Sequence, residues 1–188
     1  MLPWRWVTIP LVRNAEAHHG GHRHAHRAQP RLRPNGIRTR NAPAATLEDR
    51  AIGCVDPRVD PAHVLGIALG EVGVIRNVGG RVTPAAIGEV ALLGRLTMAM
   101  GGFTGPPGDL IVLQHTDCGI TRLQDPPEQL AGYFQVGAAA LADKHVADPW
   151  AAVEADVAIL RSLPPITERF QVTGLVYDVE TGRVERAA

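Results

Sequence analysis

Residues 110–119 have the sequence LIVLQHTDCG and contain the clearest strand signal in the chain. The first four residues are an uninterrupted apolar run, which is typical of a strand buried on both faces of a parallel sheet. Polar residues follow at once, among them His115 and Cys118. Because ligands of α/β proteins bind beyond the carboxyl ends of the strands, this stretch predicts a functional site at that edge of a sheet.

Shorter apolar runs alternate with helical patterns on both sides of this stretch. Proline follows Asp60 and Thr83, which predicts helix starts at both places. The sequence predicts strands at 50–54, 72–77, 110–115 and 171–179, helices at 61–69, 84–100, 127–144 and 149–163, and a short hairpin return at 183–185. The predicted fold is therefore α/β, with a mainly parallel central sheet flanked by helices and an antiparallel C-terminal strand or hairpin.

Composition divides the chain of 188 residues into two parts. Residues 1–45 hold eight Arg, one acidic residue and five of the eight His, and carry a net charge of +7. Residues 46–188 carry −7, so the whole chain is neutral. We expect a disordered basic tail over 1–45 and one domain over 46–188, with no nucleic acid as partner.

The chain contains no apolar run long enough for a membrane span, and its first residues are too interrupted for a signal peptide. We therefore expect a cytoplasmic protein that binds no membrane. The two cysteines are too few for a disulfide scaffold. A disulfide between Cys54 and Cys118 is an alternative that a cytoplasmic location disfavours.

Both cysteines lie where a predicted strand ends, and His115 precedes Cys118 by three residues. Taken singly, each of these groups has an ordinary structural explanation, such as a buried free thiol. Together, Cys54, His115 and Cys118 supply two sulfurs and one nitrogen, which with an open fourth position is a catalytic zinc set.

Asp56 and Arg58 follow Cys54 closely and are two residues apart, so they project to the same side of an extended segment. The arginine is expected to keep the carboxylate ionised and oriented as a catalytic dyad. Asp56 is also the nearest candidate for a fourth metal ligand, in a closed and inactive state of the site.

The pairing of Cys-x-Asp-x-Arg at 54–58 with His-x-x-Cys at 115–118 resembles the β-class carbonic anhydrases. The resemblance runs from about residue 47 to the C-terminus and includes VIRNVGGRVT at 74–83 and the hairpin at 174–182. The pattern is most similar to the compact bacterial branch, which is also similar to the carbonyl sulfide hydrolases. A phosphate loop at Gly79-Gly80 is disfavoured, since the Gly-x-Gly-x-x-Gly spacing and a lysine are missing.

This resemblance implies zinc held by Cys54, His115 and Cys118, an orienting dyad of Asp56 and Arg58, and a homodimer or dimer of dimers. It implies reversible hydration of carbon dioxide to bicarbonate by zinc-bound hydroxide. Two alternatives remain open: a carbonyl sulfide or carbon disulfide hydrolase on the same zinc site, and an inactive zinc-bearing binding protein with Asp56 permanently on the metal. The sequence does not identify the residues of the substrate pocket.

Overall fold

The computed structural model describes residues 48–68, 70–103 and 105–188. The predicted basic tail lies outside the described residues. A five-stranded sheet has the order β2-β1-β3-β4-β5. Its strands are β1 (Asp49–Cys54), β2 (Val72–Asn77), β3 (Gly108–His115), β4 (Phe170–Tyr177) and β5 (Val184–Arg186).

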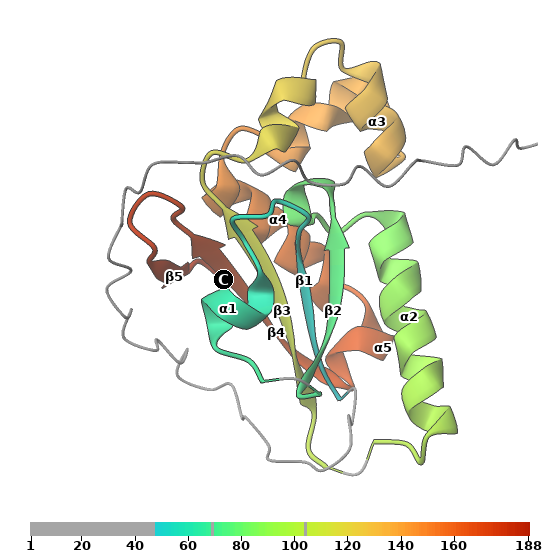
Figure 1. Cartoon of the computed structure of the whole chain (residues 1–188). Coiled ribbons are helices and arrows are strands. Elements are labelled where there is room, and N and C mark those ends of the chain that lie inside the picture. The colour runs from blue at the N-terminus through green and yellow to red at the C-terminus, as the bar shows by residue number, and fades with distance from the viewer. Residues whose placement is uncertain (1–47, 69, 104) are drawn as a thin grey trace, which may run out of the picture. The chain divides into compact units, whose positions relative to one another are not determined.

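The pairing of the strands confirms the predicted fold class. β1 pairs in parallel with β2 and β3, and β3 pairs in parallel with β4. β5 returns antiparallel to β4 through the C-terminal hairpin. The first four strands therefore present their carboxyl ends at one edge of the sheet (Figure 1).

Helices cover both faces of the sheet (Figure 1). One core cluster joins Leu110 and Val112 of β3 to residues of α2 (Pro84–Ala99), α4 (Pro149–Arg161) and α5 (Pro164–Thr167). The alternate β3 residues, Ile111 and Leu113, pack on the other face with Leu65 of α1 (Pro61–Leu65). β3 is thus buried on both faces, as its apolar run predicts.

Three helices begin with the same capping arrangement, in which a polar N-cap precedes a proline. The side chains of Asp60, Thr83 and Asp148 accept hydrogen bonds from backbone amides in the first turns of α1, α2 and α4. These caps satisfy backbone amides that have no partner within the helix, and they fix the residue at which each helix begins. α1 is shorter than predicted because Gly66 adopts a left-handed conformation and ends it.

The prediction of one helix over 127–144 is wrong. The structure has α3 (Glu128–Phe134) and a separate 3₁₀ helix, η3 (Ala138–Lys144). The break occurs at Gln135, whose φ of 53° is left-handed, and at Gly137, which is extended. The break lets Leu130 and Phe134 of α3 pack against the cysteines at the sheet edge, so tertiary packing overrides the local helical pattern.

Together with η2 (Gly119–Leu123), α3 and η3 form a cap, residues 119–144, beyond the carboxyl ends of β1 and β3 (Figure 1). No helix in the described part of the chain has the length and apolar character needed to cross a membrane.

Candidate metal centre

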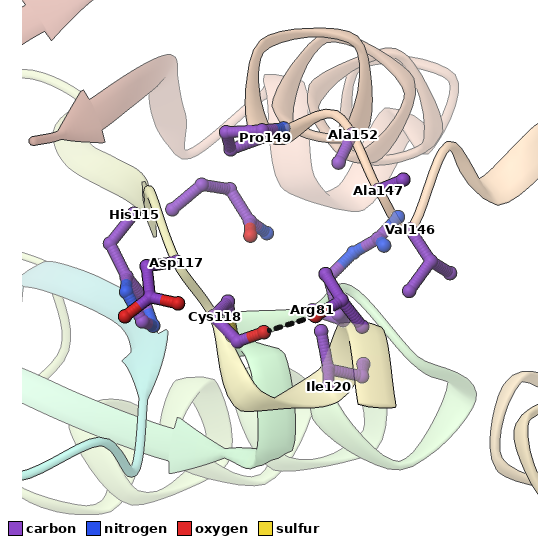
Figure 2. Close-up of a pocket in the computed structure, with 11 residues that line it drawn as sticks. Arg81, His115, Asp117, Cys118, Ile120, Val146, Ala147, Pro149 and Ala152 are labelled. Atoms are coloured by element: carbon purple, nitrogen blue, oxygen red, sulfur yellow. Dashed lines mark hydrogen bonds between the residues drawn. The ribbon is translucent and has the colours of Figure 1, made fainter. Parts of the chain in front are cut away.

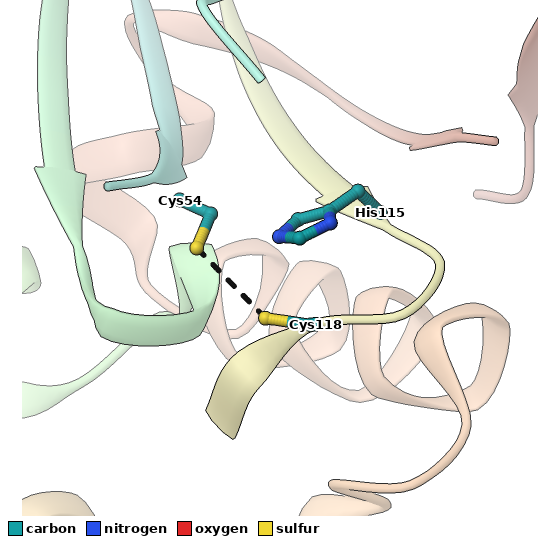
Figure 3. Close-up of side chains that lie close together, drawn as sticks. All are labelled: Cys54, His115 and Cys118. Atoms are coloured by element: carbon teal, nitrogen blue, oxygen red, sulfur yellow. Dashed lines mark hydrogen bonds between the residues drawn. The ribbon is translucent and has the colours of Figure 1, made fainter. Parts of the chain in front are cut away.

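The structure brings Cys54, His115 and Cys118 together, as Figure 3 shows. Cys54 is the last residue of β1, and His115 is the last residue of β3, the adjacent strand. Cys118 follows on the loop that leads into η2. The three potential ligand atoms lie within 4.8 Å of one another, and all three residues are buried.

His115 presents the nitrogen that a metal needs. Its Nδ1 lies 2.9 Å from the carbonyl oxygen of Thr116. Because a carbonyl only accepts hydrogen bonds, Nδ1 carries the proton and Nε2 keeps a free lone pair. Nε2 is buried and has no hydrogen-bond partner among the described residues. An unsatisfied imidazole nitrogen beside two thiols fits a soft divalent cation such as zinc.

The two thiols lie within hydrogen-bonding distance of each other. Their Sγ atoms are 3.8 Å apart, and both cysteines are free. The hydrogen bond from Cys118 lowers the pKa of Cys54 to about 4, with smaller contributions from His115 and from the Asp56 amide. The same hydrogen bond, together with burial, raises the pKa of Cys118. The hydrogen bond between the thiols thus favours the thiolate form of Cys54, which is the form of cysteine that binds a metal.

The Gly79-Gly80 pair allows the chain after β2 to approach the metal centre closely. A Cβ atom on Gly80 would lie 2.7 Å from the backbone nitrogen of Cys54, and the φ of Gly80 is +62°. The amide of Gln114 donates to the Gly80 carbonyl at 2.9 Å. Backbone packing against the end of β1 therefore explains Gly80, whereas Gly79 lies against the side chain of Ile120.

Arg58 holds the Asp56 carboxylate in a fork. Its Nε donates to Asp56 Oδ1 at 3.1 Å, and its Nη2 donates to Oδ2 at 2.8 Å. The Arg58 amide adds a third hydrogen bond to Oδ1, at 2.9 Å. These hydrogen bonds lower the pKa of Asp56 to about 2, so the carboxylate is ionised at neutral pH.

Arg76 positions the loop that carries Asp56 and Arg58, a role that its sequence context does not predict. Its guanidinium donates to the carbonyl oxygens of Cys54, Asp56 and Val59, at 2.9, 2.9 and 3.1 Å. Arg76 lies in the VIRNVGGRVT segment at 74–83 that supports the family resemblance, but that pattern does not predict carbonyl oxygens as its partners.

An apolar wall lies against the cysteines and was not predicted. We define it as the buried side chains that cluster with both thiols, and they come mostly from the cap: Ile120, Leu130, Phe134 and Val146. Tyr133 packs against this wall, and its hydroxyl donates to the Val78 carbonyl at 2.8 Å. Burial raises the pKa of Tyr133 to about 12, so its hydroxyl remains protonated.

A small pocket reaches His115 and Cys118 from the side of α4 (Figure 2). Its lining combines apolar side chains with polar ones, and Arg81, Gln114 and His115 are its buried polar members. Arg81 donates to Asp156 from Nε at 2.7 Å and from Nη2 at 3.2 Å, and both residues are almost completely buried. This ion pair joins the segment between β2 and α2 to α4.

Comparison with known proteins agrees with this geometry. The family model described as carbonic anhydrase matches residues 50–135. β-Carbonic anhydrase 1 of Mycobacterium tuberculosis is 31% identical over 142 residues, a match that covers 71% of this chain and 77% of the relative. A carbon disulfide hydrolase of Acidianus sp. is also 31% identical, over 160 residues, with 71% and 74% covered.

A solved structure supports the same assignment. The carbonic anhydrase of Streptococcus mutans is 31% identical and superposes with a TM-score of 0.56, covering 77% of this chain and 84% of the other. The fold, the motifs and these matches have one explanation in common. The chain belongs to the β-carbonic anhydrase family.

Proposed function

We propose that this protein is a zinc-dependent enzyme that reversibly hydrates carbon dioxide to bicarbonate. The observation that carries the proposal is the unsatisfied Nε2 of His115 beside the thiols of Cys54 and Cys118. These three residues would hold zinc. When bound, zinc supplies a Lewis acid that lowers the pKa of a coordinated water towards about 7.

Asp56 and Arg58 would orient the water that attacks the substrate. The ionised Asp56 carboxylate is an acceptor next to Cys54, and the fork of Arg58 keeps it in place. An ionised carboxylate in that position accepts a hydrogen bond from the attacking water and aligns its lone pair with the carbon of the substrate. Each hydration releases one proton, which passes to solvent.

The apolar wall and the small pocket beside His115 and Cys118 suit a small, uncharged, linear substrate. Carbon dioxide fits this description, and so do carbonyl sulfide and carbon disulfide. The carbon disulfide hydrolase among the relatives makes sulfide release the second candidate activity. An inactive binding protein is less well supported, since Asp56 is held by Arg58 and is not directed at the metal position as a fourth ligand.

One preparation with stoichiometric zinc tests both activities. Stopped-flow hydration of carbon dioxide and sulfide release from carbonyl sulfide and carbon disulfide give three values of kcat/KM. We expect the value for carbon dioxide to be the highest. A higher value for either sulfur substrate would reverse the assignment, and activity with none of them would favour the binding protein.

We also propose that the chain acts as a homodimer or a dimer of dimers in the cytoplasm, where its thiols stay reduced. The outer face of α2 supports an oligomer, because it exposes Leu92, Leu96 and Met98, with Met100 just beyond the helix end. A helix with apolar residues all round is normally covered. Sedimentation equilibrium measures the oligomeric state directly.

A further inference from the structure

Arg58 contacts both loops that carry the metal ligands. Besides its fork on Asp56, its Nη1 donates to Asp117 Oδ2 at 2.8 Å, and its Nη2 donates to the Asp117 carbonyl at 2.9 Å. Asp117 lies between His115 and Cys118. Arg58 thus ties the loop after β1 to the loop after β3, at the point where both approach the metal position.

These contacts leave Arg58 little freedom. Four of the five N–H donors of the guanidinium are used, two on Asp56 and two on Asp117. The Arg58 side chain is about half exposed, with 48% of its surface accessible. An exposed arginine held by one carboxylate alone is only weakly fixed, whereas two anchors on separate loops define its position.

The backbone of Asp117 is adapted to this contact. Its φ of 51° is left-handed, which is uncommon outside glycine but tolerated by aspartate and asparagine. In this conformation, both the carbonyl and the carboxylate of Asp117 accept hydrogen bonds from the Arg58 guanidinium. The Asp117 side chain is itself exposed and is not a member of the ligand cluster.

We propose that Asp117 is a positioning residue that fixes Arg58 and thereby keeps Asp56 away from the metal. This inference rests on the proposed function, because it concerns the state of the same site. Without the Asp117 carboxylate, Arg58 loses its anchor on the second loop and its fork on Asp56 loosens. Asp56 then occupies the fourth coordination position more often, and a smaller fraction of the protein turns over substrate.

This role predicts a combination of effects that a purely structural role does not. A site closed by a carboxylate has four protein ligands, so it holds zinc at least as tightly as the native site while kcat falls. A loop that is merely disordered holds zinc less tightly. The sign of the change in zinc affinity therefore separates the two explanations.

The test compares Asp117→Gly and Asp117→Asn, two residues that tolerate a positive φ. Glycine removes both the acceptor and the charge, whereas asparagine keeps an acceptor. We expect kcat for carbon dioxide to fall about tenfold in Asp117→Gly and less in Asp117→Asn. Glu154→Gln, which removes one exposed negative charge on α4, is the matched control and should behave as the native protein.

Cobalt(II) substituted for zinc reports coordination without any need for turnover. We expect the visible absorption of the Asp117→Gly protein to shift towards that of a site with an added oxygen ligand, and zinc affinity to be unchanged or higher. A native cobalt spectrum, or weaker zinc binding in both variants, would overturn the inference. If the native protein hydrates no carbon dioxide but the spectrum still shifts, the proposed function fails while the role of Asp117 stands.

Discussion

Two arginine–carboxylate assemblies flank the candidate metal centre, and they differ in burial. Arg81 and Asp156 are 1% and 0% exposed and lie 75 residues apart in sequence. Arg58 and Asp56 are 48% and 14% exposed and lie two residues apart. Water can solvate the second pair when it separates but not the first. The buried pair therefore serves as scaffold, whereas separation of the exposed pair would cost the fold less.

The largest effect on stability is expected when the buried assembly is broken. Asp156→Ala removes the carboxylate that pairs with Arg81 and accepts hydrogen bonds from the Val82 backbone amide and the Gln114 side chain. Breaking a buried ion pair in this way should lower the free energy of unfolding by about 3–5 kcal/mol. Urea denaturation followed by circular dichroism measures this, and a change below about 1 kcal/mol would contradict a scaffold role.

Breaking the exposed pair of Arg58 and Asp56 should reduce activity strongly and stability only slightly. Arg58→Ala frees Asp56 to take the remaining coordination position, so kcat/KM should fall by about 100-fold while zinc remains bound. The free energy of unfolding should change by about 1 kcal/mol or less, because the Arg58 side chain is about half exposed to solvent. Arg183→Ala, which removes an exposed arginine of the C-terminal hairpin, serves as control. Normal turnover by the Arg58→Ala protein would argue against the dyad.

A smaller effect is expected from the backbone contact beneath the metal centre. Gly80→Ala places a Cβ against the Cys54 amide and strains a positive φ, so it should destabilise the fold by about 1–3 kcal/mol. Gly88→Ala is the matched control, because it lies inside α2 with open space around it. The Gly88→Ala substitution should raise the free energy of unfolding by about 0.5–1 kcal/mol. Thermal denaturation of both variants checks the difference, and equal melting temperatures would contradict it.

The smallest effect is expected from removal of residues 1–45. Their composition does not support a packed core, so deletion should leave zinc content and kcat unchanged. Metal analysis and carbon dioxide hydration of the shortened chain test this. A clear loss of either property would mean that the segment contributes to the active protein.

Much of the sheet could be predicted because β3 is buried on both faces, and its sequence is accordingly an unbroken apolar run. The proximity of Cys54 to His115 could also be predicted, since each is the last residue of a strand and the carboxyl ends of parallel strands lie at the same edge of the sheet. The break in the helix over 127–144 could not, because it depends on where Phe134 packs.

The pairing of Arg58 with Asp56 was predicted, but the partner of Arg81 and the second partner of Arg58 could not be predicted from the sequence. Arg81 pairs with a carboxylate on α4, and no local pattern connects positions so far apart. Asp117 was visible within the His-x-x-Cys motif, but its contact with Arg58 depends on how two loops fold across the sheet edge. Residue types and spacing thus predict which groups meet at strand ends, whereas the contacts that hold those groups depend on tertiary structure.

The proposed function depends above all on the binding of zinc by Cys54, His115 and Cys118. Zinc content per chain, measured by plasma mass spectrometry after dialysis, tests it on the native protein and on Cys118→Ser. We predict one zinc per native chain and loss of most of it from the variant, whose fold is checked by circular dichroism, because the substitution removes a thiolate ligand. Stoichiometric zinc in a folded Cys118→Ser protein would contradict the assignment.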